Sequence, residues 1–152
     1  MTDQTQTNND PYYALPAVPS FELRSSTVAD RTPFAPAQYS GVFGVPGGQD
    51  ISPELTWSGF PDETRSFIVT VFDPDAPTGS GFWHWAVGNI PVSTTHLVEN
   101  AGSETQELLP AGAVAFPNDA GLARYIDAAP PAGSGVHRYY ITVSALDVAR
   151  LE

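Results

Sequence analysis

The sequence predicts an all-β fold with minor helical content, a β-sandwich of mainly antiparallel strands in one domain. The 152 residues include 13 glycines and 15 prolines, and 11% of the residues are aromatic, a composition typical of short strands joined by turns. No stretch has the length and period of a long amphipathic helix, and the nearest is the short span 120–125. A chain of this length can bury about two-thirds of its unfolded surface, enough for one core.

The first half of the chain begins with a tail and then a short strand. Residues 1–10 are polar and are predicted to be disordered, so the predicted single domain spans 11–152. Apolar and charged side chains alternate over residues 21–24 (FELR), which predicts a half-buried strand. Residues 41–50 (GVFGVPGGQD) have the composition of turns.

Three longer segments are the main strand candidates. Residues 66–75 (SFIVTVFDPD) are apolar on both faces, which predicts a central strand, and Pro74 ends it because proline cannot donate a ladder hydrogen bond. Residues 82–89 (FWHWAVGN) form an aromatic-rich candidate. Residues 139–146 (YYITVSAL) form the last one, after the Pro/Gly-rich loop 129–135.

The composition excludes several classes of function. Cysteine is absent, which excludes disulfides, thiolate nucleophiles and cysteine-based metal centres. Lysine is also absent, which excludes a P-loop lysine and Schiff-base chemistry. The net charge of −11 argues against nucleic acid as a partner. No apolar run is long enough to span a membrane, so stable membrane insertion is not predicted. The N-terminus does not resemble a secretory signal, and we therefore expect a cytoplasmic protein.

Polar side chains lie at the ends of the predicted strands or within them. Asp73 and Asp75 are two residues apart, so both point to the same side of an extended chain. His137 and Tyr139 are spaced in the same way, and His84 lies in the aromatic-rich strand. If the fold brings these strands together, two carboxylates, two imidazoles and a phenol line one cavity.

Strand alternation also predicts what lies outside that cavity. His84 is expected on the face opposite to Trp83 and Trp85, which we predict pack behind the site. Arg138 is expected to point away from the cavity and to be structural.

Enzyme interpretations each lack a required part. No Gly-x-Ser-x-Gly elbow and no His-Glu-x-x-His motif occurs, so neither a serine hydrolase nor a metal site is predicted. Asp73 and Asp75, on one strand face, cannot flank a sugar bond from two sides. Ordinary structural roles also fit, because Asp-Pro-Asp is a common turn and a histidine among tryptophans is often a core residue.

A binding pocket is the interpretation that fits best. Protonated His84 and His137 would donate hydrogen bonds to an anion, and backbone N–H groups of residues 133–135 would add donors. Asp73 and Asp75 would orient the imidazoles and accept from a ligand ammonium group, so a zwitterion carrying phosphate and ammonium would match both signs. No cofactor is predicted.

Several short motifs together resemble a known family, the phosphatidylethanolamine-binding proteins, and in particular their bacterial Raf-kinase-inhibitor-like branch. The motifs occur in order at Asp73-Pro74-Asp75-Ala76-Pro77, His84-Trp85, Asn89-Ile90-Pro91, Pro130-Pro131 and His137-Arg138-Tyr139. The similarity runs from about residue 11 to residue 147.

The resemblance implies a β-sandwich with a small anion pocket at one end. Its lining, carried over by position, is Asp73, Asp75, Pro77, His84, Pro130, Pro131, His137 and Tyr139. The implied ligands are phosphate, phosphorylethanolamine or a phospholipid head group, bound without catalysis. The resemblance further implies a cis bond at Ala76–Pro77. Some family members inhibit kinases or serine proteases, so a regulatory role with an unidentified protein target is a second expectation.

The chain departs from the family pattern at two places. Residues 126–129 (IDAA) replace the usual Gly-Pro before the paired prolines, which changes one pocket wall. The chain ends at Glu152, where relatives usually continue into a C-terminal helix, so exposed apolar surface is expected there. Bacterial relatives often pair, and a homodimer is therefore a prediction to test. Two alternatives stay open: a hydrolase or phosphatase that uses the same His and Asp residues, and an interaction module with a vestigial pocket.

Overall fold

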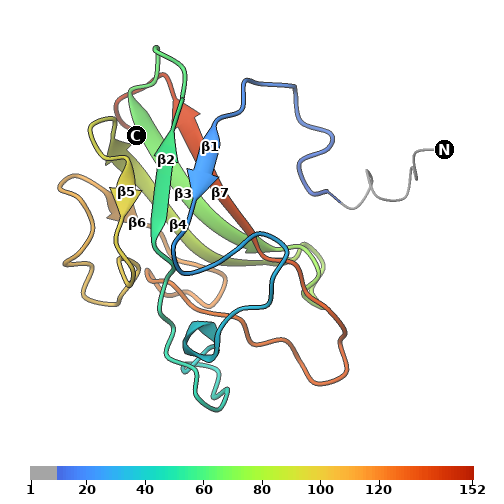
Figure 1. Cartoon of the computed structure of the whole chain (residues 1–152). Coiled ribbons are helices and arrows are strands. Elements are labelled where there is room, and N and C mark those ends of the chain that lie inside the picture. The colour runs from blue at the N-terminus through green and yellow to red at the C-terminus, as the bar shows by residue number, and fades with distance from the viewer. Residues whose placement is uncertain (1–9) are drawn as a thin grey trace.

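Two antiparallel sheets face each other in the computed structural model, which describes residues 10–152 (Figure 1). One sheet has the strand order β1 (Glu22–Arg24), β2 (Leu55–Ser58) and β5 (His96–Leu97). The other has the order β6 (Val114–Ala115), β4 (Phe82–Pro91), β3 (Ser66–Asp73) and β7 (Tyr140–Leu146). Among the described residues the only helical element is a 3-10 turn, η1 (Pro36–Gln38). The predicted all-β class is confirmed.

The core lies between the two sheets and is centred on β3. Phe67, Val69 and Val71 alternate along β3 and are fully buried against Leu55 and Trp57 of β2. Burial of each such side chain stabilises the fold by about 1.5–3 kcal/mol. The central position of β3, between β4 and β7, agrees with the prediction from its two apolar faces.

A β-bulge interrupts the pairing of β3 with β4 and changes the predicted side-chain directions. Val71 pairs with Trp85 and the next residue, Phe72, pairs with Trp83, so His84 is the extra residue in β4. Val71 and Phe72 are neighbours in β3 and point to opposite faces of the sheet. Their partners Trp85 and Trp83 therefore also point to opposite faces. The prediction that they share a face is wrong, because alternation in one strand cannot reveal an inserted residue.

The two tryptophans accordingly have different surroundings. Trp85 is fully buried in the core, with its ring edge-on to Tyr125. Trp83 is 37% exposed and stacks on Phe72 with a centroid distance of 4.2 Å. Of the pair, only Trp85 has the packing role that was predicted.

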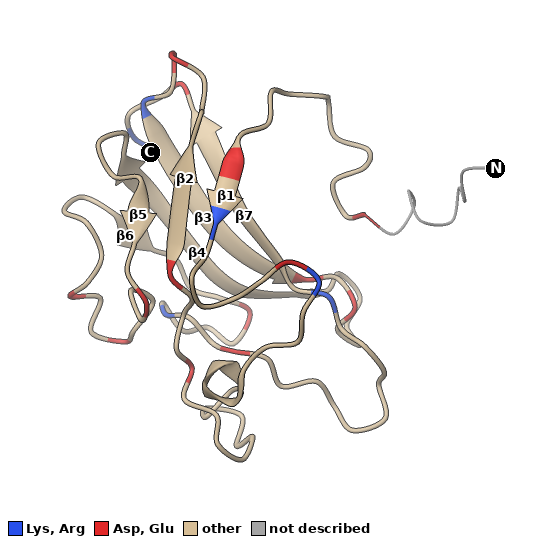
Figure 2. Cartoon of the chain, in the orientation of Figure 1, with Lys and Arg blue, Asp and Glu red and all other residues tan. Residues whose placement is uncertain are grey.

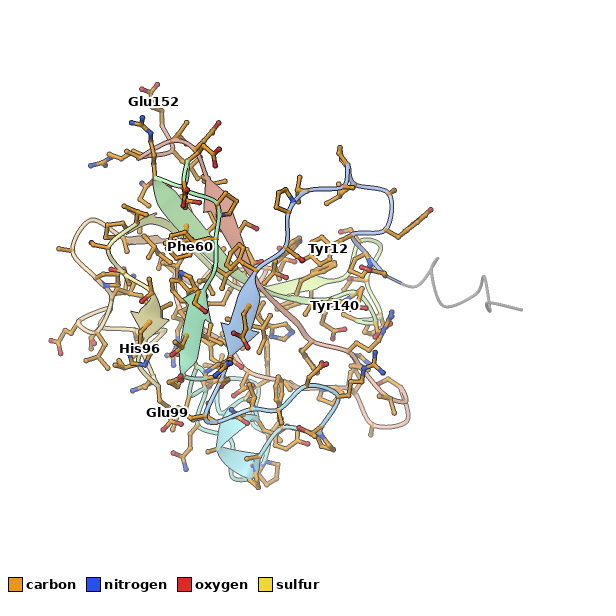
Figure 3. The ribbon with its side chains drawn as sticks, turned by 45° about the horizontal axis from the view of Figure 1, so that its top comes forward. Tyr12, Phe60, His96, Glu99, Tyr140 and Glu152 are labelled. Carbon is orange, nitrogen blue, oxygen red and sulfur yellow. The ribbon has the colours of Figure 1, made fainter. Side chains whose placement is uncertain are left out.

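The edge strand β7 is covered in part by the segment that precedes β1. The rings of Tyr12 and Tyr140 meet edge-on at 5.9 Å, and Figure 3 shows both labelled side chains beside each other. Asp10 starts this segment with a turn in which its Oδ1 accepts a hydrogen bond from the Tyr12 N–H at 2.8 Å. The predicted disordered tail, 1–10, otherwise lies outside the described residues.

Charged residues are placed mainly in loops and turns, and the long strands of the larger sheet carry few of them (Figure 2). Within residues 10–152, no helix is both long enough and apolar enough to cross a membrane.

Candidate ligand-binding pocket

A cavity of about 430 Å³ lies where loops gather beyond the end of β3 and the start of β4. The loops of this end of the sandwich are at the bottom and on the right of Figure 1. All of the predicted site residues except Asp75 line the cavity: Asp73, Pro77, His84, Pro130, Pro131, His137 and Tyr139. The far-apart motifs therefore do converge on one hollow.

Strand pairing explains why the first two polar groups meet. β3 pairs with β7 up to Phe72 and Tyr140, so the residues just beyond that pair come together. The Asp73 carboxylate accepts a hydrogen bond from Nδ1 of His137, with Oδ2 and Nδ1 2.7 Å apart. The two side chains are only 4% and 2% exposed, which makes this a buried, charge-assisted contact.

The second ring nitrogen of His137 contacts Ser134, a residue that the sequence analysis did not single out. Ser134 Oγ lies 2.9 Å from Nε2 and donates its only proton to the Pro131 carbonyl, 2.7 Å away. With its proton directed to Pro131, the hydroxyl oxygen can accept a hydrogen bond from Nε2. Asp73 and Ser134 together hold the His137 ring at the cavity wall. The sequence feature that could have identified Ser134 is a hydroxyl in a Gly-Ser-Gly loop, three residues before a histidine.

His84 has the opposite character. Its Nδ1 donates to the Ile126 carbonyl at 2.8 Å, so Nε2 carries the lone pair of the neutral ring. Burial lowers the pKa of His84, and the Ile126 hydrogen bond and the Asp73 charge oppose this only in part. At neutral pH His84 is therefore an acceptor. We expected both histidines to donate hydrogen bonds to an anion. His84 can donate from Nε2 only when its ring is protonated, which requires a pH below the ordinary pKa range of histidine.

Tyr139 closes one side of the cavity beside His84, with the two rings edge-on at 5.3 Å. Burial raises the pKa of the Tyr139 phenol, and the Asp73 carboxylate raises it further. The phenol therefore keeps its proton and can donate a hydrogen bond.

Asp75 does not line the cavity, which corrects the prediction that it faces the histidines. Its two carboxylate oxygens accept hydrogen bonds from Nε and Nη2 of Arg138, each at 2.8 Å, and this pairing lowers the pKa of Asp75. Strand β3 ends at Asp73, whose Oδ1 accepts the Asp75 N–H at 2.8 Å, so the chain has already turned. Strand alternation does not apply beyond that turn. Arg138, as predicted, is not among the lining residues.

The predicted cis bond at Ala76–Pro77 is also wrong, since residues 10–152 contain no cis peptide bond. The chain reverses here by another route, in which the Thr78 N–H donates to the Ala76 carbonyl at 2.7 Å. That hydrogen bond closes a three-residue turn around Pro77, and the fixed φ of proline suits the central position.

The wall formed by residues 126–129 contains a buried acid that the sequence analysis did not recognise. Asp127 is 1% exposed, and its Oδ1 accepts the Tyr125 hydroxyl at 2.7 Å. Its Oδ2 has no hydrogen-bond partner. Burial raises the pKa of Asp127 to about 7. Across residues 10–152, no group of three or more His, Cys, Asp or Glu side chains is arranged to hold a metal ion.

A sandwich of two antiparallel sheets with a ligand-sized pocket at its loop end is thus the class of protein that the structure defines. The family model of the phosphatidylethanolamine-binding proteins matches residues 24–152. The chain belongs to this family.

Individual relatives agree with that assignment. The chain is 44% identical to the UPF0098 protein YbcL of Escherichia coli over 132 residues, which are 87% of this chain and 72% of YbcL. It is 48% identical to E. coli YbhB over 105 residues, 69% of this chain and 65% of YbhB. The crystal structure of YbcL, described as a member of the mammalian PEBP family, superposes with a TM-score of 0.84 at 43% identity, over 87% of this chain and 80% of that chain. A Chlamydia trachomatis homologue, CT736, superposes with a TM-score of 0.68 at 30% identity, over 85% and 76% of the two chains.

Proposed function

We propose that the protein binds a small oxyanion, such as phosphate or a phosphate monoester, in this cavity without transforming it. The observation that carries the proposal is the His137 ring, which Asp73 holds against the cavity and whose Nε2 contacts a hydroxyl that a ligand oxygen can replace. A ligand oxygen that replaces Ser134 at Nε2 gains a charge-assisted hydrogen bond, and the Tyr139 hydroxyl supplies a second donor. The net charge of −11 repels an anion in the cavity only weakly, because charges more than about 8 Å away are screened at physiological salt.

The same hydrogen bonds favour binding over hydrolysis. Ser134 donates to the Pro131 carbonyl and not to His137, so no base activates its hydroxyl as a nucleophile. Asp75 is bound to Arg138 outside the cavity, which leaves Asp73 as the only carboxylate among the lining residues.

The test is a titration with inorganic phosphate, followed through the side-chain NMR signals of the histidines and by calorimetry. Phosphate should shift the His137 signals, and His137→Gln should weaken binding at least tenfold because it removes the ring that would donate to the anion. His96→Gln is the matched control, since His96 is half-exposed near Glu54 and outside the cavity, and it should bind like the parent. Unmoved His137 signals at millimolar phosphate would overturn the proposal and favour the interaction module with a vestigial pocket.

The hydrolase alternative has its own readout. Sustained turnover of p-nitrophenyl phosphate that His84→Ala abolishes would contradict the non-enzymatic part of the proposal. The cytoplasmic location, the homodimer and a kinase or protease target stay predictions, which fractionation, sedimentation and pull-down experiments can test.

A further inference from the structure

The cavity is much larger than the anion that its polar groups can hold. A volume of about 430 Å³ falls within the range of pockets for drug-sized ligands. A phosphate ion that accepts hydrogen bonds from His137 and Tyr139 would leave most of that space unfilled. The other lining residues are therefore available to contact a larger ligand.

Those other residues are mainly apolar, and aromatic rings lead from the buried imidazole towards solvent. The ring of Phe82 lies 4.8 Å from that of His84, and the ring of Phe43 lies 6.2 Å from that of Phe82. His84 is buried, Phe82 is half-buried and Phe43 is 50% exposed. Pro130 and Pro131 are exposed and also line the cavity, so this apolar part forms its mouth.

Phe43 is held in place although it is half-exposed. Its N–H donates to Ser40 Oγ at 3.1 Å, and the N–H of Val45 donates to the Ser40 carbonyl at 2.8 Å. The N–H of Val42 donates to Asp50 Oδ2 at 2.8 Å. These hydrogen bonds fix the backbone that carries the Phe43 ring, so ordering this loop costs little conformational entropy on binding.

The lining offers no unpaired carboxylate to a cationic substituent. Asp73 is paired with His137, and Asp75 lies outside the lining and is paired with Arg138. An ammonium group in the cavity would therefore lose its hydration without gaining an unpaired carboxylate. A zwitterionic head group, which the sequence analysis favoured, fits this lining poorly.

We infer that the ligand is an oxyanion with an uncharged apolar substituent, such as an aryl or alkyl phosphate monoester, and that Phe43 and Phe82 bind this substituent. The inference rests on the proposed oxyanion site and adds a second subsite to it. Selectivity then comes from the apolar mouth, and the His137 end of the cavity recognises any oxyanion of suitable size.

Three probes test this inference: inorganic phosphate, phenyl phosphate and phosphorylethanolamine. Phenyl phosphate should bind about 10–50-fold more tightly than phosphate, from the apolar area that its ring buries. Phosphorylethanolamine should bind no more tightly than phosphate. Phe43→Ala should weaken phenyl phosphate binding several-fold and leave phosphate affinity within about twofold, because only the ring contact is lost.

The matched control is Leu108→Ala, since Leu108 is equally exposed at 50% but does not line the cavity, and it should change neither affinity. Equal binding of phosphate and phenyl phosphate, tighter binding of phosphorylethanolamine, or an equal loss of both ligands in Phe43→Ala would each overturn the apolar subsite. Failure of every probe to shift the His137 signals would instead overturn the proposed oxyanion site.

Discussion

Ser134 occupies the position at His137 where the proposed ligand must bind. Its hydroxyl lies 2.9 Å from Nε2 and donates to the Pro131 carbonyl, which holds it there. Gly133 and Gly135, on either side, have φ values of 80° and 83°, a region that glycine adopts without steric cost. Anion binding is therefore an exchange in which a ligand oxygen replaces an internal one.

This exchange predicts a gain of affinity when the hydroxyl is removed. Ser134→Ala leaves Nε2–H without its internal acceptor, so phosphate should bind about 5–10-fold more tightly, while the unliganded protein loses about 1 kcal/mol of stability. Calorimetry and chemical denaturation measure the two effects. Ser103→Ala, which removes a hydroxyl bonded to Thr105, is the control and should not change phosphate affinity. Unchanged or weaker binding in Ser134→Ala would contradict the exchange.

Among the structural elements, the turn between β3 and β4 supports the site because it positions Asp73. Gly81 in this turn has a φ of 77°, and a Cβ atom there would lie 2.7 Å from the Asp73 carbonyl oxygen and from the Phe72 ring. The bulge at His84 follows directly in β4. Bulges near binding sites re-aim side chains, and here the inserted residue, His84, lines the cavity.

Gly81→Ala should therefore destabilise the fold by about 2–3 kcal/mol, from backbone strain together with steric overlap. Because the overlap is with Asp73 itself, phosphate affinity should also fall. Gly79→Ala is a control in the same turn, since a Cβ at Gly79 meets nothing within 4 Å. Denaturant unfolding of both variants measures the difference, and equal stabilities would show that the turn tolerates a side chain at both positions.

For the whole molecule, the buried Asp127 predicts an unusual dependence of stability on pH. Its pKa is raised to about 7 in the folded state, against about 3.9 in an unfolded chain. Between these values the folded protein keeps a proton that the unfolded chain has lost. The contribution of Asp127 is thus fully present below about pH 4 and is lost as the pH rises through 7.

Asp127→Asn removes this titration. The variant should gain stability relative to the parent between pH 4 and pH 8, by at most about 4 kcal/mol, because it has no carboxyl to ionise in the core. Asp62→Asn, at an exposed position, is the control and should track the parent at both pH values. Free energies of unfolding at the two pH values measure the effect. A parallel pH profile for Asp127→Asn and the parent would show that Asp127 is ionised in the folded protein.

Local sequence patterns were sufficient to predict the class of fold and the main strands, and they named the polar residues Asp73, His84, His137 and Tyr139 of the lining, while the family resemblance added its prolines. The predicted strand 66–75 is observed as β3, Ser66–Asp73, and the predicted strands 82–89 and 139–146 are observed with shifts of one or two residues at their ends. Alternation of apolar residues and the positions of proline report the backbone and burial of one segment at a time, which is the information these predictions needed.

What the sequence determined by itself is where strands form, which faces are apolar and which chemical groups are available for a site. The tertiary structure alone decided that His84 is the inserted residue of a bulge, that Asp75 binds Arg138 outside the cavity and that Ser134 covers His137. Each of these depends on register or turn geometry between segments, and the hydrogen bond of Asp73 with His137 joins residues 64 positions apart. Pairing across such separations is set by the packing of the whole chain, which no local pattern encodes.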